Sequence, residues 1–306
     1  MTSVSSFRIG FVPTLEAIPL VSCAVRHQQW RMHPCSSYGR IIRHLLTDQL
    51  QAGLLPWELC VTELLCKPAQ NAAWQIPLVI HPCPTELALS VRALNMVYPP
   101  KSSKKGRKKR LSIGLEGRFS LTRHQVLAWQ SKVAPQQLES PSFKFLPMEL
   151  MQKGLEADFI DGFVAPTPWG LQAACHPDIR IDPAFEPGKF AQHVVLVCTR
   201  DAAETFTREL DDLPAQLAAS RQPLTEESQF RQRASEMTAL GLPHCDVDQL
   251  WRASATLQPV GADRGDFKPD KAWVERQFRV LSERLPSSAT HLDLNRAKAA
   301  LLEPPC

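Results

Sequence analysis

The residues with the clearest chemical potential lie near the middle of the chain. Phe159 to Ala165 is a mostly apolar run, too short for a typical helix but right for a buried strand. Pro166 ends this strand, and Thr167 can cap a helix that has Pro168 in its first turn. Free backbone N–H groups and the helix dipole at such a helix start favour an anion. The same residues are also compatible with an ordinary strand-to-helix connection that binds nothing.

Similar junctions, where a cap-forming residue precedes a helix, recur along the chain. Thr14 follows a predicted strand at 7–12, and Ser36 or Ser37 can cap a helix that begins at Tyr38. The other predicted strands are 52–55, 77–80, 111–115, 143–146 and 193–198, and helices are predicted at 15–28, 38–50, 56–66, 119–129, 148–155 and over most of the chain after 202. This alternation predicts an α/β fold whose largely parallel sheets bind ligands at the carboxyl ends of strands.

The composition is that of a globular protein rather than a disordered one. Of the 306 residues, 44% are hydrophobic and 22% are charged. The net charge of +4 comes mainly from the basic run at 101–110, so the rest of the chain is not a general polyanion binder. The run has no interleaved aromatic residues and lies between two predicted elements, which favours a solvated loop over a nucleic-acid site.

Cysteine spacing and the N-terminal sequence bear on cofactors and location. The nine cysteines are scattered and form no CxxC pair, so we expect reduced core thiols, no metal site and no cofactor. The first residues show no signal-peptide pattern, and no uninterrupted apolar stretch has transmembrane length. We therefore expect a cytoplasmic protein with no membrane span, and a periplasmic one only if the true start lies upstream.

Several segments, taken in order, resemble one family. They are Arg8-Ile-Gly-Phe-Val-Pro13, Ser37-Tyr38 through Gly53, Thr85 to Ser90, Ser120-Leu-Thr-Arg-His124, Asp161-Gly-Phe-Val-Ala-Pro-Thr-Pro-Trp169 and Lys268-Pro-Asp-Lys-Ala-Trp273. Together they are similar to the nitrate/bicarbonate-type substrate-binding proteins of ABC transporters, including their cytoplasmic nitrate-sensor relatives. The segment that ends at Trp169 is the most specific of them.

The resemblance implies a two-lobed periplasmic-binding-protein type II fold that closes on a ligand by hinge motion. Lobe one would comprise residues 1–92 and 193–306, lobe two 111–192, and the basic stretch 93–110 would act as a hinge. His124 would donate to an anion, and Tyr38 and Trp169 would form walls of the site. The full set of ligand-binding residues that the resemblance implies is Thr14, Tyr38, Thr85, Thr122, His124, Thr167 and Trp169.

Departures from the family pattern bear on the ligand. Tyr38 replaces the family's Trp, and Pro166-Thr167 replaces its Gly-Glu. A carboxylate at Glu58 or Glu86 beside the ligand would oppose an anion. The resemblance thus implies a non-enzymatic protein that binds a small anion, acts as a cytoplasmic sensor and engages a regulatory protein or a transporter. The alternatives are a cytoplasmic enzyme on the same fold, similar to chorismate dehydratase, and an interaction module that has lost its ligand.

Overall fold

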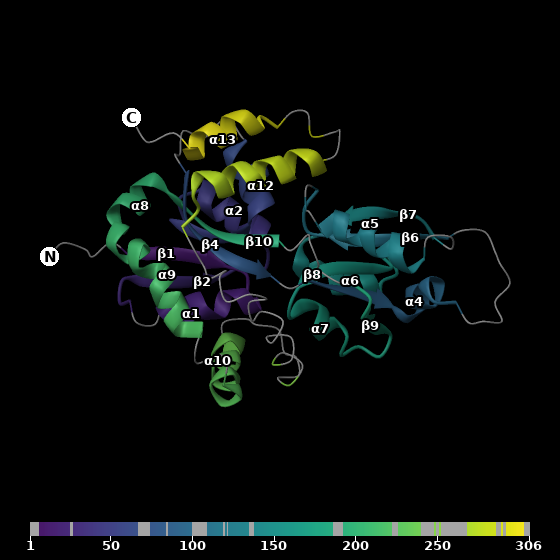
Figure 1. The fold of residues 1–306 in the computed structure, drawn as a ribbon. Coiled ribbons are helices and arrows are strands. Elements are labelled where there is room, and N and C mark those ends of the chain that lie inside the picture. Colours follow the sequence, from purple (N-terminus) through teal and green to yellow (C-terminus); the bar gives the residue numbers. More distant parts are fainter. Residues whose placement is uncertain are drawn as a thin grey trace. The chain divides into compact units, whose positions relative to one another are not determined.

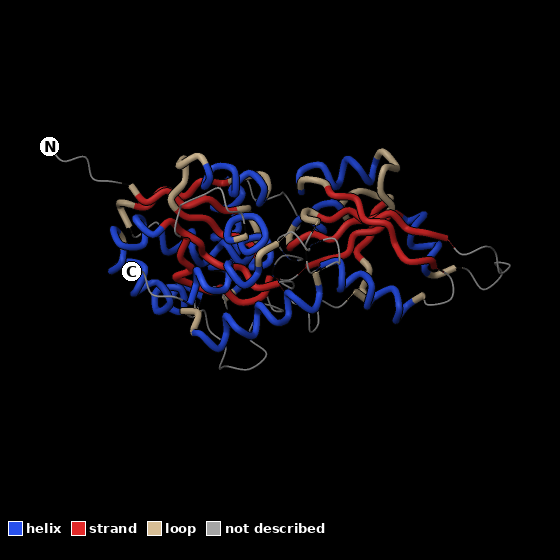
Figure 2. Tube along the Cα trace, turned by 90° about the horizontal axis from the view of Figure 1, so that it is seen from above, coloured by secondary structure: helices blue, strands red, loops and turns tan. Residues whose placement is uncertain are grey.

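The computed structural model forms two compact units. It describes residues 6–24, 27–66, 74–83, 85–99, 109–118, 120, 122–134, 138–185, 192–221, 226–239, 248, 251, 268–285, 289 and 292–302. Unit 1 contains Met1–Pro82, His193–Leu242 and Leu257–Cys306. Unit 2 contains Cys83–Gln192 and Pro243–Thr256. In each unit the strands form a sheet with helices packed on its faces (Figure 1 and Figure 2).

The sheet of unit 1 has the strand order β2-β1-β3-β10-β4. Its strands are β1 (Phe7–Phe11), β2 (Trp30–Pro34), β3 (Ala52–Pro56), β4 (Trp74–Cys83) and β10 (Gln192–Thr199). β1 pairs in parallel with both β2 and β3, whereas β10 runs antiparallel to β3. The sequence analysis did not predict β2, which forms the edge next to β1.

The helices of unit 1 lie on this sheet or on one another. They are η1 (Leu15–Ala17), α1 (Ile18–Ala24), α2 (Tyr38–Leu46), α3 (Trp57–Cys60), η2 (Val61–Leu65), α8 (Arg200–Thr205), α9 (Thr207–Arg221), α10 (Glu227–Ala239), α12 (Lys271–Arg284) and α13 (Leu294–Leu302). A Cβ atom at Gly53 would lie 2.4 Å from Ile41 Cγ2, so α2 rests directly on the backbone of β3. The predicted helix 38–50 is too long, since α2 stops before Asp48, which has a φ of 54°. The helix predicted to reach residue 28 ends at Ala24.

The sheet of unit 2 has the order β7-β6-β8-β5-β9 and separates two hydrophobic clusters. Its elements are β5 (Thr85–Ser90), α4 (Val91–Val97), β6 (Lys109–Leu115), α5 (Thr122–Val133), β7 (Leu138–Phe145), α6 (Met148–Glu156), β8 (Gly162–Pro166), α7 (Trp169–Ala173) and β9 (Ile179–Ile181). β6 pairs in parallel with β7 and β8, and β5 runs antiparallel to β8 and β9. Leu87 packs with α5 on one face of the sheet, and Ala88 packs with α6 and α7 on the other.

The boundary between the units differs from the predicted one at residue 92. β5 pairs with β8 and β9, and this pairing places residues 83–92 in unit 2. Of the predicted hinge 93–110, residues 93–97 belong to α4 and 109–110 begin β6, while 100–108 lie outside the described residues. The hinge therefore stays a prediction.

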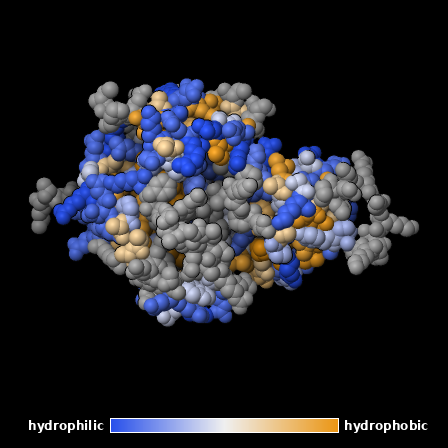
Figure 3. Space-filling model, in the orientation of Figure 1, coloured by the Kyte–Doolittle hydropathy of each residue, from blue (hydrophilic) through white to orange (hydrophobic). Residues whose placement is uncertain are grey.

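Among the described residues, the large apolar side chains that are exposed belong to unit 2. They are Tyr98, Phe145, Leu150 and Phe159. On the face drawn in Figure 3, hydrophobic and hydrophilic side chains lie side by side over this unit. Scattered apolar residues of this kind are ordinary for a protein surface.

Candidate functional site

The connection from β8 to α7 is the junction that the sequence analysis placed first, and its helix is capped differently from the prediction. The N-cap of α7 is Pro168, and no side-chain hydrogen bond caps the helix from that residue. Thr167 Oγ1 instead donates to Glu86 Oε1 over 2.9 Å, and the backbone N–H of Leu171 donates to Glu86 Oε2 over 3.0 Å. The prediction that Thr167 caps this helix is thus wrong. The carboxyl group of Glu86 accepts the helix N–H in its place.

The antiparallel pairing of β5 with β8 brings Glu86 to this junction. Thr85 lies opposite Pro166 and Glu86 opposite Ala165, so the start of β5 meets the end of β8. A Cβ atom at Gly170 would lie 2.5 Å from Glu86 Oε2 and 2.8 Å from Glu86 Cβ. Only glycine at position 170 therefore leaves room for the carboxyl group against the first turn of α7.

Burial sets the electrostatic character of Glu86. Desolvation raises the pKa of this carboxyl from its ordinary value of 4.5 to about 7, although the hydrogen bonds from Thr167, Leu171 and Gly170 favour the charged form. At neutral pH the group is therefore present in both its protonated and its ionised form. The helix start where we expected an anion from solution holds an acidic group of the protein itself.

Three other predicted residues of unit 2, Thr85, Thr122 and His124, belong to the opposite face of the sheet or to the helix that covers it. Successive side chains of a strand point to opposite faces, so Thr85 faces α5 while Glu86 faces α7. Thr85 Oγ1 donates to Gln125 Oε1 over 3.1 Å, and Ser120 Oγ lies 2.8 Å from Thr122 Oγ1. His124 lies half-buried on the same helix as Thr122. These side chains share one end of the sheet with Thr167 but not one face.

Trp169 contributes to the core of unit 2. It is partly buried and packs against the cluster of Ala88, Met151 and Ala173. Its indole Nε1 is buried without a hydrogen-bond partner among the described residues. Its predicted role as a wall of the ligand site stays a prediction.

In unit 1 the structure brings Thr14 and Tyr38 together around a carboxyl group that the sequence analysis overlooked. Thr14 Oγ1 lies 2.6 Å from Glu16 Oε1, and Tyr38 OH lies 3.4 Å from the same oxygen. All three residues are buried, at the carboxyl ends of β1 and β2. The signal that could have found Glu16 is an acidic residue two positions after a predicted cap, in an otherwise apolar first turn. Glu58, just after β3, is fully buried.

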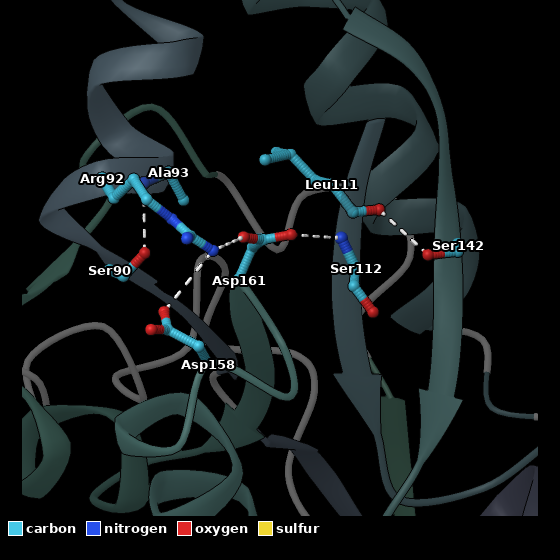
Figure 4. Close-up of polar contacts among 8 residues, drawn as sticks. All are labelled: Ser90, Arg92, Ala93, Leu111, Ser112, Ser142, Asp158 and Asp161. Carbon is cyan, nitrogen blue, oxygen red and sulfur yellow. Dashed lines mark hydrogen bonds and ion pairs between the residues drawn. The ribbon is translucent and has the colours of Figure 1, made fainter. Parts of the chain in front are cut away.

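Asp161, at the other end of β8, has a structural role (Figure 4). Its Oδ2 accepts from the backbone N–H of Ser112 over 2.8 Å, and its Oδ1 pairs with Arg92 over 3.0 Å. Its backbone N–H and C=O bond to Ser112 and Ser90, so Asp161 ties β8 to β6 and β5. The next residue, Gly162, has to be a glycine, because a Cβ atom there would lie 2.7 Å from the carbonyl oxygen of Ala88.

Within the described ranges, no group of three or more His, Cys, Asp or Glu side chains is placed to hold a metal ion. None of the helices described has the length and hydropathy needed to cross a membrane.

No family model and no curated protein matches the sequence, but the structure has clear relatives. A zinc-bound ligand-binding component of an ABC-type import system from Staphylococcus aureus aligns with a TM-score of 0.66 and 12% identity, covering 98% of this chain and 97% of that one. The alkanesulfonate-binding protein SsuA from Xanthomonas axonopodis pv. citri, bound to MOPS, aligns with a TM-score of 0.65 and 12% identity. The alignment covers 96% of this chain and 97% of that one. The periplasmic nitrate-binding protein NrtA from Synechocystis PCC 6803 aligns with a TM-score of 0.65 and 12% identity. The alignment covers 99% of this chain and 90% of that one.

These likenesses define the class of fold. Over nearly its whole length the chain has the fold of the periplasmic binding proteins, which confirms the two-lobed α/β architecture predicted from the sequence. The structural relatives reported above are ligand-binding proteins by name. At 12% identity the comparison speaks to the fold, and the ligand has to be argued from this chain's own residues.

Proposed function

We propose that this protein binds a small anionic solute and does not catalyse a reaction. The observation that carries the proposal is the fold, which is shared along nearly the full chain with proteins that bind nitrate and alkanesulfonate. The hydroxyl groups of Thr85, Thr122 and Thr167 at one end of the unit 2 sheet support it, since neutral O–H groups of this kind bind a small anion when it replaces their protein acceptors, which are Gln125 for Thr85 and Glu86 for Thr167.

We also propose that the protein acts in the cytoplasm as a sensor. In that role ligand occupancy would change its affinity for a regulatory protein or a transporter. The cysteines support this location, because Cys35, Cys60, Cys66, Cys175 and Cys198 are free thiols and all of them except Cys175 are buried. Free thiols persist in a reducing compartment.

A thermal-shift screen of the purified full chain tests the binding proposal. The compounds are nitrate, nitrite, bicarbonate, ethanesulfonate and benzoate as sodium salts, with sodium chloride at equal ionic strength as the control. A true ligand at a hundred times its Kd adds about 3 kcal/mol of stability, which raises the Tm by about 5 °C or more.

A negative screen would change the assignment. If none of these anions raises the Tm at any pH between 6 and 8, the proposed function is wrong. Capture of one protein partner, equally strong with and without every anion, would instead favour the interaction module.

A further inference from the structure

Glu86 is a partly buried titratable group for which solute binding alone gives no reason. Its two oxygens accept from the Thr167 hydroxyl and the Leu171 N–H, which are donors that an incoming anion would need. Gly170 provides the space that the carboxyl group fills. An ionised carboxylate in this position opposes a second anion close by, because two negative charges in a poorly solvated site repel each other.

Among the described elements that contact Glu86, β8 and α7 bring no charge close to it. β8 and α7 contain no ionisable residue. On β9, Arg180 lies opposite Leu89, and its Nη1 donates to the carbonyl oxygens of Ile179 and His176. The ionisable residues of α6, which packs on the same face, are exposed; they are Glu149, Lys153 and Glu156.

Other described charged residues of unit 2 lie elsewhere on the sheet or on its other strands. Arg92 of α4 pairs with Asp158 and Asp161 at the opposite end of β8. α5 carries Arg123, His124 and Lys132, but it covers the other face of the sheet. Glu116 follows β6, which is separated from β5 by β8.

We propose that the protonation state of Glu86 determines whether unit 2 binds an anion. An anion binds beside Thr167 only when the Glu86 carboxyl group is protonated. Anion binding is therefore accompanied by the uptake of a proton. This inference rests on the proposed function. Protonation removes the negative charge and turns one oxygen from an acceptor into an O–H donor, which can then face the anion. Glu86 is in this sense a specificity-determining residue and links anion affinity to pH.

The expected size of the effect follows from the titration of Glu86 near neutrality. With half-protonation at about pH 7, anion affinity is about tenfold weaker at pH 8 than at pH 6. Binding takes up about 0.9 proton at pH 8 and about 0.1 proton at pH 6.

Isothermal titration calorimetry of the full chain with sodium nitrate and sodium ethanesulfonate measures both quantities. Each titration is run at pH 6 and pH 8, in two buffers with different ionisation enthalpies, so that proton uptake is read directly. Glu86→Gln keeps the shape of the side chain but cannot ionise. Glu139→Gln, an exposed carboxyl on β7 of the same unit, is the matched control.

We expect proton uptake and pH dependence in the wild type and in Glu139→Gln, and neither in Glu86→Gln. If an anion binds Glu86→Gln but not the wild type, the inference is supported, because removal of the negative charge then permits binding. The same result contradicts anion binding as the native function. Equal affinity at pH 6 and pH 8 in the wild type, or unchanged proton uptake in Glu86→Gln, overturns the inference while leaving anion binding in place. Binding to neither protein overturns both proposals.

Discussion

Strand β8 has a carboxyl group at each end, and the two groups differ in every respect that matters for function. At its start, Asp161 pairs with the guanidinium of Arg92 and accepts a backbone N–H from Ser112. At its end, Glu86 is partly buried against α7 and, among the described residues, accepts from the neutral donors of Thr167 and the backbone of α7. The carboxyl group of Asp161 holds neighbouring strands in register, whereas the carboxyl group of Glu86 has a pKa of about 7, close to neutral pH.

The difference shows how surroundings assign a role to a carboxyl group. A paired carboxylate with a backbone contact contributes to stability at all neutral pH values. A buried carboxyl group without a nearby cation is held close to its neutral form, and its charge then responds to small changes in its neighbourhood. The predictions below test this contrast between the start and the end of β8.

The largest effect is expected at the start of the strand, from Gly162→Ala. The added Cβ would lie 2.4 Å from Leu89 Cδ2 and 2.7 Å from the carbonyl oxygen of Ala88, and the backbone atom cannot move without breaking the β5–β8 pairing. We expect a loss of about 3 kcal/mol in the free energy of unfolding, measured with urea. Gly39→Ala is the control, because a Cβ there meets nothing within 4 Å. Equal stability of the two variants would show that β8 does not pack as described.

The next effect concerns the end of the strand and the pH. The pKa of Glu86 rises from 4.5 to about 7 on folding, so the folded chain binds more protons than the unfolded chain between these values. The protonated group contributes stability that is fully present below about pH 4.5 and is lost as the pH rises through about 7. We expect the wild type to lose about 2 kcal/mol more than Glu86→Gln between pH 5 and pH 8, measured by urea unfolding. Parallel pH profiles for the two proteins would contradict this.

A smaller effect is expected from the polar contacts of Asp161. Asp161→Asn removes the charge that Arg92 and the N–H of Ser112 share, and we expect a loss of about 1–2 kcal/mol. Arg92→Ala should cost less than about 1 kcal/mol, since its side chain is 57% exposed. Urea unfolding of both variants checks the order. A larger loss for Arg92→Ala would mean that the ion pair, rather than the contact with Ser112, fixes the strand.

The fold could be predicted from the sequence because local patterns determine most of it. Strand-length apolar runs such as Leu111–Leu115 and cap residues such as Ser37 mark their elements correctly, and Ser37 does accept the N–H of Arg40. β2 was missed, and only residue 30 of this edge strand is buried. Helix ends were misplaced where a left-handed residue such as Asp48 stops the helix.

The candidate site was harder to predict because its contacts are distant in sequence. Glu86 was noted as a carboxylate that would oppose an anion, but its position depends on pairing with Ala165, 79 residues further along the chain. Thr167 has the residue type of a cap, yet a stronger acceptor from another strand engages its hydroxyl. The set of Thr14, Tyr38 and Glu16 likewise forms only after β1 and β2 have paired.

The titration of Glu86 itself is the most direct test of the contrast between the two ends of β8. Carbon-detected NMR of the glutamate side-chain carboxyl groups, with Glu86→Gln to assign the resonance, reports the pKa of this group in the full chain. We predict one resonance that is absent from the variant and titrates at about 7. A Glu86 carboxyl that titrates at its ordinary value of 4.5 would show that it is a solvated anion at neutral pH, and would contradict its role in controlling solute charge.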